Sequence, residues 1–109
     1  MPSYSRGDVI LVPYPFSDLS STKVRPAIVV SKTYPSNDVI VVPLTSRTGN
    51  LLPGEFVLQD WRGAGLNVMS AVKRGLFLTD TNIIQYRTGN ISDRDMQRLE
   101  ASLRFWLGL

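Results

Sequence analysis

The chain of 109 residues contains no cysteine and no histidine. The lack of cysteine excludes disulfides and thiolate zinc sites, and it leaves the redox state of the compartment open. The lack of histidine removes the commonest general base near pH 7 and the commonest metal ligand. Any acid–base chemistry must therefore come from other side chains.

Long apolar runs are also missing. No stretch approaches the roughly 18 apolar residues that span a bilayer, and the N-terminus lacks the pattern of a signal peptide. We therefore expect a cytoplasmic protein without a membrane partner. The length, with 43% hydrophobic and 19% charged residues, is that of one ordinary globular domain covering residues 1–109.

The charge balance is mildly basic, with a net charge of +3 and nine arginines against three lysines. The planar fork of arginine suits two-point contact with phosphate or carboxylate groups. A polyanion is thus a plausible partner. The excess is small, however, and many soluble proteins that bind no nucleic acid share it.

The most informative stretch surrounds Arg25. Pro26 pushes the backbone of Arg25 into an extended conformation, and it can itself occupy the first residue of a strand. Residues 27–30 are apolar on both faces, as in a strand inside a sandwich or barrel. Arg25 therefore emerges where the polar loop of residues 17–22 meets a rigid strand, either to bind a ligand or to pair with a loop carboxylate.

Most of the chain has the pattern of short strands. Pro13–Phe16 should leave the first strand and present two aromatic rings outside a regular ladder. Thr45, Ser46 and Arg47 gather two hydroxyls and a cation at another strand end, which could meet Arg25 at one rim of a small barrel. The expected strands are 7–12, 25–31, 39–42 (buried on both faces), 54–59, 67–72, 76–79 and 83–87, and residues 88–90 close the β part.

The last part of the chain predicts one amphipathic helix, Asp93–Leu107. Ser92 can cap it, and acidic residues in the first turn favour the positive end of the helix dipole. The apolar residues follow at spacings of three and four and mark one face, which packs on the barrel or across a dimer. They are Met96, Leu99, Leu103, Trp106 and Leu107.

Several blocks together resemble the PemK/MazF toxins of bacterial toxin–antitoxin systems. They are Gly7-Asp-Val-Ile-Leu-Val12, Arg25-Pro-Ala-Ile-Val-Val-Ser31, Val42-Pro-Leu-Thr-Ser46, Ser70-Ala-Val-Lys73 and the final helix. The resemblance implies an SH3-like β-barrel with a C-terminal helix, usually a homodimer. It also implies a sequence-specific endoribonuclease that needs no metal or other cofactor, cleaves single-stranded RNA to a 2′,3′-cyclic phosphate, and is neutralised by a cognate antitoxin.

By the same resemblance the catalytic residues are Arg25 and Thr45. Arg25 can hold two non-bridging phosphate oxygens in the transition state. Thr45 is a hydrogen-bonding positioner, because a neutral hydroxyl is a poor base. Two departures leave the general acid and base unassigned. Some members use a histidine in or near the first loop, and this chain has none; Gly75 stands where some members carry a carboxylate.

For RNA contacts we expect Ser46, Arg47, Lys73 and Arg74 around the phosphates, with Phe16 and Trp61 as platforms for unpaired bases. Each has an ordinary alternative. The two aromatic residues could belong to the core or its rim, and the basic residues could form a solvated face.

Two other functions stay open. The same barrel could be a binding module that has lost catalysis, in line with the missing carboxylate at Gly75. It could also be a gyrase-directed toxin, since toxins of that kind share the fold and end in an aromatic-rich tail. The segment Arg104–Leu109 resembles such a tail only loosely.

Overall fold

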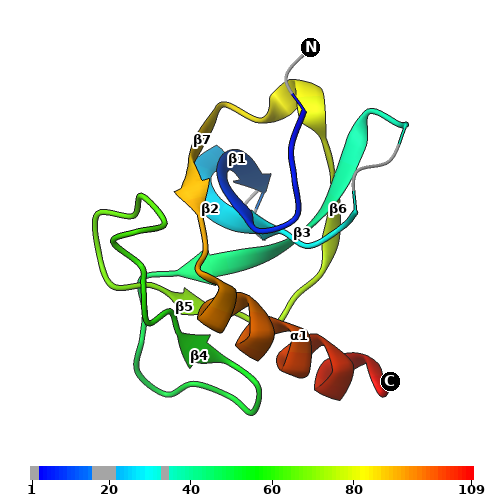
Figure 1. Cartoon of the computed structure of the whole chain (residues 1–109). Helices are drawn as coiled ribbons and strands as arrows, with labels where there is room; N and C mark the ends of the chain where they lie inside the picture. Colours follow the sequence, from blue (N-terminus) through cyan, green and yellow to red (C-terminus); the bar gives the residue numbers. More distant parts are fainter. Residues whose placement is uncertain (1–2, 16–21, 33–34) are drawn as a thin grey trace.

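The computed structural model describes residues 3–15, 22–32 and 35–109. Over these residues it contains seven β-strands, a short 3₁₀ helix (Thr81–Ile83) and the helix α1 (Asp93–Leu107) (Figure 1). The strands are β1 (Asp8–Pro15), β2 (Thr22–Val29), β3 (Asp38–Thr45), β4 (Phe56–Val57), β5 (Ala71–Val72), β6 (Phe77–Asp80) and β7 (Tyr86–Asn90). None of the described helices is long and apolar enough to cross a membrane.

All strand pairs are antiparallel, in the order β4-β5-β3-β2-β1-β7, and β6 also pairs with β3. β3 is the central strand, because it pairs with β2, β5 and β6 along different parts of its length. The sheet curls on itself, with α1 along one side (Figure 1). This is the mainly β, SH3-like small barrel with a C-terminal helix that the sequence predicts.

Side chains of β1, β2 and β3 alternate between two apolar cores, which explains why these strands are apolar at nearly every position. The helix-side core contains Val9, Ile28, Val42, Leu44, Phe56, Val72 and Leu99, among others. The barrel-side core contains Ile10, Val12, Ala27, Val29, Val39 and Val41. Helix α1 packs only on the first; the second is enclosed by the curled sheet, with Tyr4, Phe77 and Ile84 packed against it.

Helix α1 has the predicted bounds. The Ser92 hydroxyl caps it by accepting from the backbone N–H of Asp95, and Gly108 ends it in the left-handed conformation. Leu99 is fully buried, and Met96, Leu103 and Trp106 pack against the helix-side core. The inclusion of Leu107 in the buried face is wrong, since its side chain is 53% exposed.

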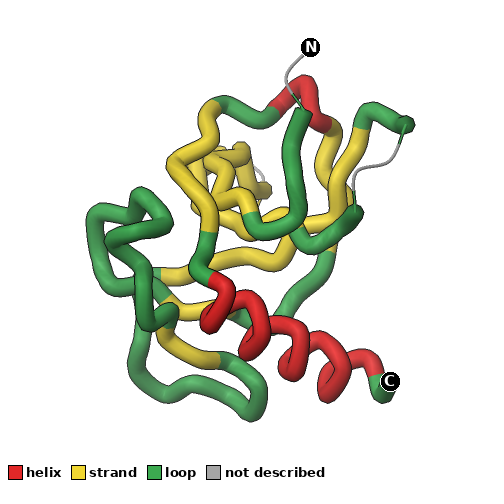
Figure 2. Tube along the Cα trace, in the orientation of Figure 1, coloured by secondary structure: helices red, strands yellow, loops and turns green. Residues whose placement is uncertain are grey.

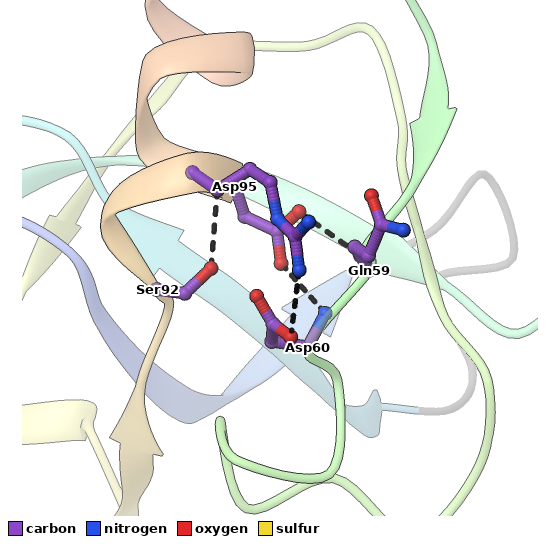
Figure 3. Close-up of polar contacts among 5 residues, drawn as sticks. Gln59, Asp60, Ser92 and Asp95 are labelled. Atoms are coloured by element: carbon purple, nitrogen blue, oxygen red, sulfur yellow. Dashed lines mark hydrogen bonds and ion pairs between the residues drawn. The ribbon is translucent and has the colours of Figure 1, made fainter.

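Asp95 fastens α1 to the turn that follows β4. Its buried carboxylate accepts the backbone N–H of Gln59 and of Asp60, both at 2.9 Å, while Arg94 pairs with the Asp60 carboxylate (Figure 3). The sequence pattern indicated Asp95 only as a helix-dipole residue. Its larger role depends on a contact across 35 residues of chain.

The ends of β1 and β2 differ from the prediction. Residues 13–15 continue the ladder, with Pro13 opposite Val24, so the stretch does not leave the sheet before Phe16. Pro26 lies inside β2 and not at its start. It is tolerated there because β3 pairs with β2 only from Ala27 onward, which leaves one edge of β2 open at that level.

The later strands are shorter or displaced. The predicted strands 54–59 and 67–72 shrink to β4 and β5, and loop replaces the rest (Figure 2). The strand predicted at 83–87 becomes β7, which includes residues 88–90, and β6 runs one residue later than expected. Ile40 is 37% exposed, so residues 39–42 are not buried on both faces throughout.

Candidate active site

Arg25 and Thr45 come from neighbouring strands at the same level of the sheet. The last pair of the β2–β3 ladder is Ala27 with Pro43. The same register continued by two residues sets Arg25 opposite Thr45, each about 7 Å of strand beyond that pair. Beyond Ala27 and Pro43, β2 continues to pair with β1, and β3 continues to pair with β5. Arg25 and Thr45 therefore lie on either side of the point where the β2–β3 ladder ends.

Both residues belong to the face of the sheet that α1 does not cover. Side chains two apart on a strand share a face, so Arg25 lies on the side of Ala27 and Val29, in the barrel-side core. Thr45 follows Leu44, which points into the helix-side core, and so lies on the opposite side. Arg25 is half-buried, which fixes part of its stem against the sheet.

The hydroxyl of Thr45 has a defined orientation. Its Oγ1 accepts the backbone N–H of Arg47 at 3.1 Å, in a local turn typical of threonine. Since that contact uses an acceptor site, the hydroxyl proton is available to donate to a ligand. Thr45 is also paired with Ala71 of β5, which holds its backbone.

The basic corner, Lys73 and Arg74, follows β5 directly and has both side chains exposed. The backbone N–H of Lys73 donates to the carbonyl of Pro43 at 3.0 Å, two residues before Thr45. The corner is therefore tied to the strand that carries Thr45. Next to it, a Cβ on Gly75 would meet the Pro43 ring at 3.2 and 3.3 Å, so this position has little room for the family's carboxylate.

Glu55 is a carboxylate that the sequence did not point to. Its oxygens accept the backbone N–H of Leu52 and of Arg74, each at 2.8 Å. Partial burial alone would raise the pKa of Glu55, but these two hydrogen bonds and the charges of Lys73 and Arg74 outweigh it, and the pKa lies below its usual value. No local motif links residues 55 and 74, so only the β4–β5 pairing could have revealed it.

The remaining predicted RNA contacts are spread out. Ser46 and Arg47 are exposed directly after Thr45. Trp61 packs against the helix-side core, and the Arg62 guanidinium lies 4.8 Å from the centre of its ring, so its role as a platform stays a prediction. Phe16, like residues 17–21 of the polar loop, lies outside the described residues.

An open pocket of about 330 Å³ lies between the turn before β4 and α1, lined by Glu55, Arg98 and Phe105 among others. It is on the helix side and does not include Arg25 or Thr45. Arg25 and Thr45 are both half-buried, and exposed Ser46 and Arg47 follow directly. Within residues 3–15, 22–32 and 35–109, no group of three or more acidic side chains is placed to hold a metal ion.

Comparison with known proteins identifies the family of the chain. Residues 5–107 match the family described as the PemK-like, MazF-like toxin of type II toxin–antitoxin systems. The chain belongs to this toxin family. None of the curated proteins matches it at the level of the whole sequence.

Solved structures of such toxins share the fold. A mycobacterial endoribonuclease in complex with its cognate antitoxin has a TM-score of 0.77 at 18% identity, covering 100% of this chain and 97% of that one. The MazE–MazF structure from Deinococcus radiodurans has a TM-score of 0.80 at 16% identity, with coverage of 100% and 99%. The Mycobacterium tuberculosis toxin MazF-mt6 has a TM-score of 0.76 at 16% identity, with coverage of 94% and 97%.

Proposed function

We propose that this toxin-family protein is a metal-independent endoribonuclease that cuts single-stranded RNA at specific sequences. The observation that carries the proposal is the β2–β3 ladder, whose last pair is Ala27 with Pro43 and whose register, continued by two residues, sets Arg25 opposite Thr45 where the two strands separate. The match to the toxin family over residues 5–107 supports it. So does the description of similarly folded structures as endoribonucleases.

In the proposed reaction the ribose 2′-oxygen attacks the adjacent phosphorus. A new P–O bond forms, the bond to the 5′-oxygen of the next nucleotide breaks, and the products are a 2′,3′-cyclic phosphate and a 5′-hydroxyl. Arg25 holds the non-bridging oxygens as negative charge builds on them; a preorganised donor of this kind is worth about 10²–10³ in rate. The proton leaves the 2′-hydroxyl and another reaches the 5′-oxygen.

Thr45 positions the substrate and does not act as a base. Its oxygen accepts the Arg47 N–H, and its hydroxyl proton would donate to the RNA. Because the 2′-hydroxyl is already attached beside the phosphate, holding that phosphate in line supplies part of the acceleration. The two proton transfers are not assigned to any residue. Acid–base catalysis is worth about 10²–10⁴ in rate, so either another group of the chain supplies it or turnover is slow.

The proposal includes the partners that such a toxin needs. A cognate antitoxin would neutralise it, as the antitoxin-bound structure of similar fold suggests, and two copies would form a homodimer. Its cellular RNA substrate would place it in the cytoplasm. The whole chain, residues 1–109, would act as one toxin domain.

The gyrase-directed alternative has less support from the C-terminal segment. The indole N–H of Trp106 donates to the Pro53 carbonyl at 3.0 Å, and its ring sits where a Cβ on Gly54 would be. Trp106 thus packs α1 against the turn before β4. A supercoiling assay with purified gyrase would separate the two functions.

The direct test is cleavage of a mixed-sequence single-stranded RNA in EDTA by the wild type and by Arg25→Ala. We expect wild-type cleavage with 2′,3′-cyclic phosphate ends and a loss of about 10²–10³ in the variant. Equal cleavage by both proteins would refute the role of Arg25. No cleavage by a folded wild type would favour the binding module.

A further inference from the structure

Glu55 connects two segments that are distant in the chain. The turn Leu52–Glu55 is closed by its own backbone, since Glu55 N–H donates to the Leu52 carbonyl at 2.9 Å. One carboxylate oxygen of Glu55 accepts the Leu52 N–H, and the other accepts the N–H of Arg74, 19 residues away. The side chain therefore bridges this turn to the basic corner.

The turn itself is held from behind by α1. Pro53 and Gly54 occupy its central positions, and Gly54 has φ +88°, as a type II turn requires. The Ser102 hydroxyl donates to the Gly54 carbonyl at 2.7 Å, and the Trp106 indole donates to the Pro53 carbonyl. The turn that carries the Glu55 carboxylate is thus held by two hydrogen bonds from α1. The side chains of Lys73 and Arg74 are exposed to solvent.

The distance to Thr45 excludes Glu55 as the base for a 2′-hydroxyl held there. Extending the β4–β5 register sets Glu55 opposite Lys73, which bonds to Pro43 of β3. Glu55 is then two strands across and two residues along from Thr45, roughly 12 Å between Cα atoms. Both of its oxygens also already accept a hydrogen bond. Glu55 can therefore affect RNA only through Lys73 and Arg74, the residues of the basic corner.

We propose that Glu55 is a positioning residue: it fixes the backbone at Arg74 so that Lys73 and Arg74 present a preformed phosphate-binding corner beside the Arg25–Thr45 site. The inference rests on the proposed function. The corner would take an RNA phosphate next to the one being cleaved. Because the backbone of the corner is fixed before RNA binds, less conformational freedom is lost on binding.

A purely electrostatic role of Glu55 and a positioning role predict opposite effects on RNA binding. Glu55 carries a negative charge next to the corner, so removing that charge should strengthen RNA binding if Coulomb repulsion were its main influence. Positioning predicts weaker binding instead. Glu55→Gln removes the charge and leaves an NH₂ group that cannot accept the second N–H. Glu55→Asp keeps the charge but is too short to bridge the two segments.

The experiment measures kcat and KM on a short single-stranded RNA, and Kd on the same RNA with 2′-O-methyl riboses, which lack the nucleophile. We expect both Glu55 variants to raise KM and Kd about 3- to 10-fold with kcat within twofold. The salt dependence of log Kd should weaken by about 1. Glu100→Gln, which removes the same charge on α1, is the control and should bind as the wild type does.

A double-mutant cycle with Lys73→Ala/Arg74→Ala distinguishes positioning from general destabilisation. In that background Glu55→Gln should change Kd by less than twofold, because there are no corner side chains left to position. Tighter or unchanged binding by Glu55→Gln, or an equal loss in both backgrounds, overturns the inference.

The outcome also separates this inference from the proposed function. Binding of the methylated RNA tests Glu55 even if the wild type does not cleave, in which case the proposed activity fails alone. Cleavage by the wild type with no effect of Glu55 refutes only the positioning role. A wild type that neither binds nor cleaves RNA refutes both.

Discussion

At the scale of single residues, Gly75 stands where some family members carry a carboxylate, and it lies against the Pro43 ring. A Cβ at this position would lie 3.2 Å from Cγ and 3.3 Å from Cδ of the buried Pro43 ring. Pro43 pairs with Ala27 on β2 and accepts the N–H of Lys73, so its backbone is held on both sides. A side chain at position 75 would therefore press on a ring whose backbone is held in place.

We predict that Gly75→Asp does not restore catalytic power. The new side chain needs the Pro43 ring to shift slightly, which we expect to cost about 1–3 kcal/mol of unfolding free energy, as overpacking does. Denaturant unfolding and RNA cleavage by Gly75→Asp and by the control Gly75→Ala would check this. A tenfold faster kcat in Gly75→Asp alone would show that the carboxylate fits and works.

Glu55 also gives a pH prediction. Its pKa is lower in the folded protein than its ordinary value near 4.5, so its charge stabilises the fold above that value. This stabilisation should be constant from pH 8 to about 5, and it should disappear as the pH falls through the lowered pKa. Unfolding free energies of the wild type and Glu55→Gln, measured across pH 3–8, should therefore converge at low pH. A gap that grows on acidification would contradict the assignment.

At the scale of elements, local signals decided which parts of the prediction succeeded. Helix α1 carries its cap, its acidic first turn and its apolar spacing within its own sequence, so its bounds could be predicted. The short strands β4 and β5 exist only because they pair with each other and with β3. Their apolar neighbours, such as Val68 and Met69, are more than half exposed, and no local pattern distinguishes them.

We predict that Asp95→Asn weakens the attachment of α1 to the turn after β4. The amide keeps one acceptor and sets an NH₂ group against the other backbone N–H, so the expected loss is about 1–3 kcal/mol of unfolding free energy. Asp93→Asn is the matched control; it removes the same charge at an exposed position of the same first turn and should cost about 0.3–1 kcal/mol. Urea unfolding would compare them, and equal losses would contradict the role of Asp95.

At the scale of the whole molecule, the two faces of the sheet have separate roles. One face packs on α1, and the other carries Arg25 and Thr45. The Asp95 variant should therefore keep its kcat/KM at temperatures well below its midpoint of unfolding.

The sequence could name both catalytic candidates through the family resemblance, but it could not place them. Their opposition depends on the pairing of Ala27 with Pro43. A shift of one residue in that register would put one of them on the other face. Glu55 was missed for a similar reason, because its partner Arg74 is brought to it only by the sheet.

The central claim is that Arg25 and Thr45 act on one phosphate, and a double-mutant cycle in kcat/KM on single-stranded RNA tests it most directly. We expect Arg25→Ala to lose about 10²–10³ and Thr45→Val about tenfold. The double variant should be at most a few-fold slower than Arg25→Ala alone, because groups that act together are not additive. Arg104→Ala, the same charge loss on the helix, should cleave normally. Independent, fully multiplying losses, or an active Arg25→Ala, would contradict the account.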